Sequence, residues 1–65
     1  MFNKLKVRAL DVAIKEMEAL LNDYHITVET NRYFNNDSKH EKAVMAGIRA
    51  AVDVCYEIRK KYIKR

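Results

Sequence analysis

The fold of this chain is decided by the stretch VRALDVAIKEMEALLNDYHITV, residues 7–28. Its apolar residues recur at alternating spacings of three and four, as on one side of an α-helix. They are Val7, Leu10, Ile14, Met17, Leu21, Tyr24 and Val28. The stretch VMAGIRAAVDVCYEIRKKY, residues 44–62, repeats the pattern. Its stripe consists of Val44, Ile48, Ala51, Cys55, Ile58 and Tyr62. Two amphipathic helices are therefore expected.

A chain reversal near Asn36 brings the two stripes face to face. Residues whose numbers sum to 72 then lie opposite each other, for example Ile14 and Ile58. We therefore expect one all-α domain over residues 1–65, an antiparallel two-helix hairpin. Its first helix spans about residues 3–32, its turn about 33–38 and its second helix about 39–63. Residues 26–30 (ITVET) leave a short strand as an alternative, because β-branched residues alternate with other residues there.

Residues of the expected turn explain why the chain reverses where it does. Asn35, Asn36 and Asp37 can hydrogen-bond to their own backbone, which favours a turn. Ser38 followed by Glu41 matches a capping box, in which each residue bonds to a free backbone amide of the other. These residues predict that the second helix begins directly after Ser38.

Length and composition limit the function. A chain of 65 residues buries a small core, so an additional source of stability is expected. Cys55 is the only cysteine, which excludes a disulfide within the chain and is typical of a reducing cytoplasm. Charged residues interrupt every apolar run, so no membrane span is expected. The net charge of +4 leaves nucleic acid or an acidic protein surface as partners.

A second apolar face remains once the two stripes are paired. The residues assigned to it as a self-association face are Leu5, Val12, Ala19, Ile26, Met45, Arg49, Val52 and Tyr56. Burying this face between two copies would give a homodimeric four-helix bundle. Asp23 is expected level with Arg49, as an ion pair across the face. The alternative is a monomer that keeps the face for a different protein.

Basic residues gather where the two ends of the hairpin meet. This basic pole consists of Lys4, Lys6, Arg8, Arg59, Lys60 and Lys61, followed by Lys64 and Arg65. Cations in the last turn of a helix are explained by the helix dipole, whereas cations in the first turn are not. The pole is therefore predicted to bind a partner, either an acidic protein surface or, as the alternative, RNA or DNA.

The opposite end carries Arg32, Tyr33 and Phe34. The favoured expectation is that the two aromatic rings fold back and cover the end of the bundle. The alternative is an exposed anchor, since Tyr, Phe and Arg are common in protein interfaces.

No residue pattern supports catalysis. His25 and His40 lack the spacing of metal ligands, Cys55 is expected to be buried, and one glycine is too few for a phosphate-binding loop. We therefore expect no enzyme activity, no metal, no cofactor and no small-molecule substrate.

In size and layout the chain resembles the plasmid copy-number regulators, whose two-helix hairpins dimerise into four-helix bundles and bind RNA loops. This resemblance implies a dimer and keeps RNA binding open. In its Lys-rich and Asn-rich composition the chain also resembles accessory proteins of phages and mobile elements, many of which inhibit a host protein. The expected function is therefore that of a small cytoplasmic regulator or inhibitor of a partner protein, with nucleic-acid binding as the alternative.

Overall fold

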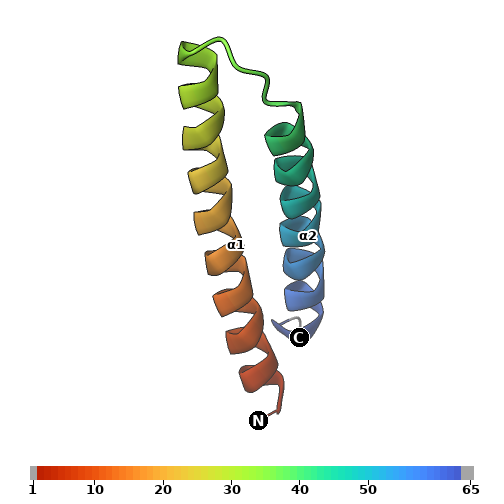
Figure 1. Ribbon diagram of the computed structural model, residues 1–65. Helices are drawn as coiled ribbons and strands as arrows, with labels where there is room; N and C mark the ends of the chain where they lie inside the picture. Colours follow the sequence, from red (N-terminus) through yellow and green to blue (C-terminus); the bar gives the residue numbers. More distant parts are fainter. Residues whose placement is uncertain (1, 64–65) are drawn as a thin grey trace.

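The computed structural model describes the backbone of residues 2–63 and the side chains of residues 3–63. It consists of helix α1 (Phe2–Tyr33) and helix α2 (Lys39–Ile63), which run antiparallel and pack against each other (Figure 1). Residues 26–30 continue α1, and no strand occurs in the described part of the chain. The all-helical hairpin is thus confirmed. Both helices end within one residue of the expected positions.

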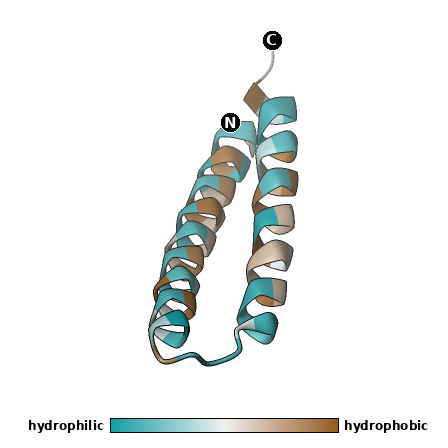
Figure 2. Ribbon diagram, turned by 90° about the horizontal axis from the view of Figure 1, so that it is seen from above, coloured by the Kyte–Doolittle hydropathy of each residue, from teal (hydrophilic) through white to brown (hydrophobic). Residues whose placement is uncertain are grey.

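The core between the helices is narrow. Three apolar side chains are buried, Ile14 at 5% exposure, Met45 at 6% and Val52 at 7%. On α1 the inward side is the expected stripe of residues 7–28, whose other members are all half-buried. Apolar positions also recur outside the contact between the helices (Figure 2). A single helical neighbour therefore leaves much of the apolar surface in contact with water.

On α2 the expected inward stripe is wrong in part. Ala51 and Ile58 are exposed, whereas Met45 and Val52, assigned to the self-association face, are buried. Helix α2 carries two overlapping apolar stripes, and the hairpin buries the one that places Met45 and Val52 against α1. Its half-buried or buried members recur at spacings of four and three: Glu41, Met45, Ile48, Val52, Cys55, Arg59 and Tyr62.

The register of the two helices follows from this choice of stripe. The Asn31 side-chain amide donates to the Ser38 hydroxyl at 3.1 Å, so these two residues are level. Their numbers sum to 69, and so do those of each further pair of inward positions, such as Ile14 with Cys55. The expected sum of 72 was therefore wrong by three residues. The heptad spacing of both helices is satisfied in the observed register.

Helix α1 ends in a Schellman motif. The Asn36 amide donates to the Asn31 carbonyl at 2.7 Å, and the Asn35 amide donates to the Arg32 carbonyl at 3.2 Å. Asn35 has a φ of 59°, the left-handed conformation that this motif requires. Asparagine tolerates that conformation better than other residues with a Cβ. The Asn/Asp run thus fixes the end of α1 through the backbone of Asn35.

The predicted capping box at the start of α2 is replaced by two other contacts. The Ser38 carbonyl accepts the first helical hydrogen bond, from the Lys42 amide at 2.9 Å, which makes Ser38 the N-cap. The Ser38 hydroxyl accepts a hydrogen bond from the side-chain amide of Asn31. The carboxylate of Asp37 accepts a hydrogen bond from the Lys39 amide at 3.1 Å. Ser38 is 8% exposed. It therefore joins the two helices instead of pairing with Glu41.

Substitutions at Asn35 should report on the left-handed turn. We expect Asn35→Gly to raise the free energy of unfolding and Asn35→Ala to lower it, by about 1 kcal/mol, because a Cβ strains this conformation. Urea titration followed by circular dichroism measures both variants. Asn36→Ala is the control, since only Asn35 has a positive φ among non-glycine residues that the structure describes. Equal effects at the two positions would contradict the motif.

Two valine substitutions should separate the core from the surface. Val52→Ala should lower the free energy of unfolding by about 2 kcal/mol, because it removes buried methyl groups. Val12→Ala makes the same chemical change at a site that is 56% exposed, and should have little effect. Thermal unfolding of the two variants measures the difference. An equal loss at both sites would show that the core has been assigned to the wrong stripe.

Candidate protein-binding surfaces

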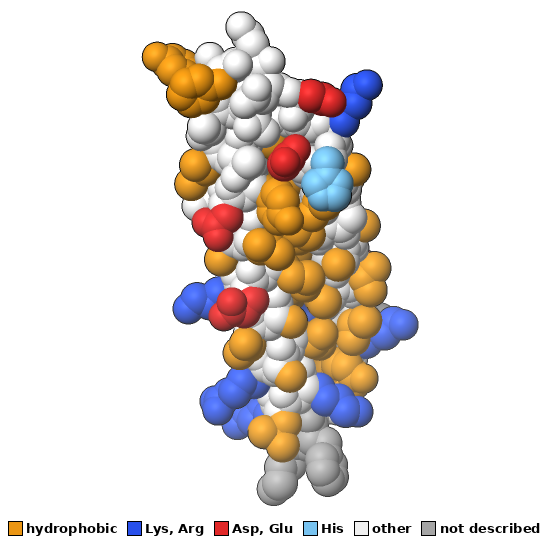
Figure 3. All heavy atoms as spheres, in the orientation of Figure 1, with side chains coloured by type: hydrophobic (Ala, Val, Ile, Leu, Met, Phe, Trp, Pro, Cys, Tyr) orange, Lys and Arg blue, Asp and Glu red, His pale blue; other side chains and the backbone are white. Residues whose placement is uncertain are grey.

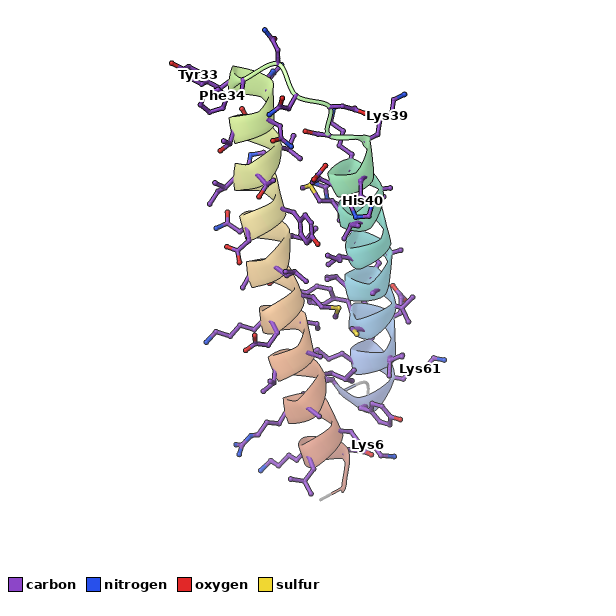
Figure 4. The ribbon with its side chains drawn as sticks, in the orientation of Figure 1. Lys6, Tyr33, Phe34, Lys39, His40 and Lys61 are labelled. Atoms are coloured by element: carbon purple, nitrogen blue, oxygen red, sulfur yellow. The ribbon has the colours of Figure 1, made fainter. Side chains whose placement is uncertain are left out.

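Helix α2 presents a continuous apolar stripe outside the core. Val44, Gly47, Ala51, Val54 and Ile58 follow one another at spacings of three and four. The same series begins with His40 and ends with Lys61, which Figure 4 places at the two ends of this side of α2. Val54 is 56% exposed and Ile58 is 37% exposed. The stripe is therefore open to a partner along most of α2.

Helix α1 extends this surface across the groove between the helices. Leu20 is 44% exposed, and Ala13 and Met17 are partly exposed. They lie on the same edge of α1 as Lys6, since Ala13 and Leu20 follow it at intervals of seven residues. Figure 3 shows hydrophobic side chains forming a band along the groove and over α2. We call this surface the apolar side: Ala13, Met17, Leu20, Val44, Gly47, Ala51, Val54 and Ile58.

The contact between α1 and α2 does not explain why residue 47 is a glycine. A Cβ added at this position would meet no atom within 4 Å. Glycine inside a helix costs about 1 kcal/mol relative to alanine, and the packing of α1 against α2 does not require it. The contact between α1 and α2 thus involves no close approach at Gly47. Among the described residues, Gly47 has open space beside it.

The residues assigned to the self-association face do not form one surface. Leu5, Val12 and Ile26 are 56–62% exposed, and Ala19 is exposed, on the side of α1 that faces away from α2. Met45 and Val52 are in the core, while Arg49 and Tyr56 lie on the edge opposite the apolar side. The assignment failed because it used the wrong stripe of α2. Leu20, Gly47 and Val54 were missed, although their spacing in the sequence follows the helical repeat.

The edge opposite the apolar side is charged. Arg59 donates through Nε to the carboxylate of Asp11, and the Tyr56 hydroxyl donates to Glu18 Oε2 at 3.3 Å. Further towards the turn, an open hollow of about 350 Å³ is lined by His25, Val28, Glu29, Lys42, Met45 and Arg49. The expected pair of Asp23 with Arg49 is not found among the described residues. The two long edges of the hairpin therefore differ, one apolar and one polar.

The pKa of the Tyr56 phenol on this edge is shifted by its neighbours. The negative charge of the Glu18 carboxylate raises the pKa of Tyr56 above its ordinary value, because an ionised phenolate beside it would be repelled. Partial desolvation and the hydrogen bond to Glu18 act in the same direction, and the cation of Arg59 opposes them. The folded chain therefore retains this proton to higher pH than the unfolded chain. This contribution to stability is lost as the pH rises through the raised pKa.

Removing the Glu18 charge should bring the pKa of Tyr56 back towards its ordinary value. We expect Glu18→Gln to lower the pKa, measured as phenolate absorbance in the difference between each protein and its Tyr56→Phe variant. Glu29→Gln is the matched control, because it removes a carboxylate further along α1. An unchanged Tyr56 titration in Glu18→Gln would exclude the contact.

The basic pole is less available than the sequence indicates. Arg59 is half-buried and paired with Asp11, and Lys60 Nζ lies 3.4 Å from Glu57. Lys6 Nζ lies 5.0 Å from the centre of the Tyr62 ring, a cation–π contact. Lys4, Arg8 and Lys61 are exposed, and no ion pair is found for them within residues 3–63. Lys64 and Arg65 lie outside the described residues. The outward-facing charge is therefore a small cluster.

The aromatic residues at the turn do not fold back over the bundle. Tyr33 is 82% exposed and Phe34 is 64% exposed. Their rings contact each other edge to face, with centroids 5.1 Å apart. Arg32 reaches only Glu29, at 3.8 Å. The expected capping role is therefore wrong, and the exposed-anchor alternative fits the geometry better.

The remaining side chains offer little for chemistry. Within the described residues no three His, Cys, Asp or Glu side chains are placed to hold a metal ion. Cys55 is a free, half-buried thiol. Neither α1 nor α2 has a segment long and apolar enough to cross a bilayer.

Comparison with known proteins adds no family to this description. No protein-family model, curated protein or solved structure matches the chain.

Proposed function

We propose that this chain is a non-enzymatic interaction protein that works as a homodimer. In this proposal the apolar sides of two hairpins close a four-helix bundle, and the surfaces left outside regulate or inhibit a partner protein. The observation that carries it is the apolar side itself, which spans both helices, while Ile14, Met45 and Val52 are the only apolar side chains that the hairpin buries among the described residues. Half of a four-helix bundle has this distribution of apolar residues.

The exposed aromatic tip and the basic pole are the proposed contacts with the partner protein. Tyr33 and Phe34 together offer a large apolar area on a turn whose backbone is fixed by the Schellman motif. Aromatic residues of this kind often carry much of the energy of an interface. Lys4, Arg8 and Lys61 supply cations for an acidic patch on the partner.

Nucleic-acid binding is the second candidate, and one observation favours it. Three basic side chains, Lys4, Arg8 and Lys61, are exposed near one end of the hairpin. The ion pairs of Arg59 and Lys60 reduce the charge available to phosphates. The exposed aromatic tip, suited to base stacking, lies at the far end of a hairpin about 50 Å long. We therefore rank this function below protein binding.

Sedimentation velocity over a wide range of concentrations tests the proposal. We expect a species of twice the 7.7 kDa chain mass that dissociates on dilution. Ala51→Glu places a charge on the apolar side and should weaken the dimer by at least about tenfold in Kd. Ala50→Glu is the matched control, because the next residue points about 100° further round the helix. A monomer at every concentration would overturn the homodimer.

The same samples test the two classes of partner. Affinity for RNA or DNA that falls steeply with salt, and that is lost in Lys4→Glu/Lys61→Glu, would favour the second candidate over protein binding. A protein binder should keep its partner in moderate salt and lose it in Tyr33→Ala/Phe34→Ala with the helicity unchanged.

A further inference from the structure

We infer that the occupant of the apolar side is a second copy of this chain in one particular arrangement. Its α2 lies antiparallel on the α2 of the first copy, around a two-fold axis at Ala51, so that the two turns lie at opposite ends. This inference rests on the proposed function, which needs a dimer but specifies no orientation.

The apolar stripe of α2 is complementary to itself about Ala51. Reversing the helix around this residue places Val44 opposite the partner's Ile58 and Ile58 opposite the partner's Val44. Each contact then occurs twice, once on each side of the axis, as a two-fold interface requires. Ala51 meets its own copy at the centre, where a small side chain allows two helices to approach closely.

The same reversal brings the partner's α2 over Gly47. A Cβ added at Gly47 would meet no atom of the described chain within 4 Å, so this position is open to the backbone of a second helix.

Charge distinguishes this arrangement from the one with both turns at the same end. Residues 3–17 and 52–63, the half nearer the chain ends, carry seven basic and four acidic side chains. Residues 18–51 carry four basic and five acidic ones. The difference comes from α1, where residues 3–17 carry four basic and two acidic side chains and residues 18–33 carry one basic and three acidic ones. Opposite orientation sets the basic half of α1 towards the acidic half of the partner's α1. An arrangement with both turns at the same end would bring the two basic poles together.

The apolar contacts that such a dimer would cover include Leu20, Val54 and Ile58, which are 37–56% exposed.

The arrangement brings the turn of one copy, with Tyr33 and Phe34, to the same end of the dimer as the partner's Lys4 and the partner's Lys61.

Disulfide trapping tests the orientation. In a Cys55→Ala background, Ala51→Cys should form a disulfide-linked dimer under mild oxidation, because position 51 meets its own copy on the axis. Ala50→Cys in the same background is the control and should remain monomeric on a non-reducing gel. Circular dichroism confirms that each variant keeps its helices.

The opposite result has a distinct signature. If the two turns lie at the same end, Leu20→Cys mixed with Ala51→Cys, both in the Cys55→Ala background, should give the mixed disulfide while Ala51→Cys alone gives none. That outcome would overturn this inference and leave the homodimer of the proposed function intact. A chain that sediments as a monomer would overturn both.

Discussion

The structure depends on which of two overlapping stripes α2 turns towards α1. Both stripes share Ile48, Cys55 and Tyr62, and they differ in whether Met45 and Val52 or Ala51 and Ile58 complete them. The hairpin buries Met45 and Val52. That choice sets the register, places Ser38 under the Asn31 amide and leaves the second stripe outside. The stripe of α2 that packs against α1 therefore determines both the core of the hairpin and its exposed apolar surface.

The choice has a physical basis in side-chain size. Both stripes of α2 alternate spacings of three and four, but Met45 and Val52 fill more volume between the helices than Ala51 does. This stripe places two charged residues, Glu41 and Arg59, at inward positions, and the desolvation cost is small. Both are only half-buried, and Arg59 retains Asp11 as a partner. A charged residue at an inward position is tolerated where the core is this shallow.

Much of the fold followed from the sequence, but the site did not. On α1 the apolar series from Leu5 to Ile26 is interrupted by Glu16 and Asp23, whereas the stripe from Val7 to Val28 is not, so the inward face and the limits of both helices could be predicted. On α2 the alanine-rich sequence is apolar over a wide arc, and local spacing alone does not separate the inward stripe from the outward one. An observation across the turn, such as the pairing of Asn31 with Ser38, was needed. The exposure of Tyr33 and Phe34 depends in the same way on the direction in which the chain leaves α1 at the Schellman motif.

The small core also bears on how the chain exists in a cell. If the proposed dimer forms, a hairpin with three buried apolar side chains gains stability from its second copy, and its folded population would rise with the concentration of the chain. Dilution, and not only heat or denaturant, would then unfold it. Copies that have not dimerised would be open to proteases. The amount of folded dimer would then rise faster than the rate of synthesis. The folded fraction of such a chain would depend on its own concentration.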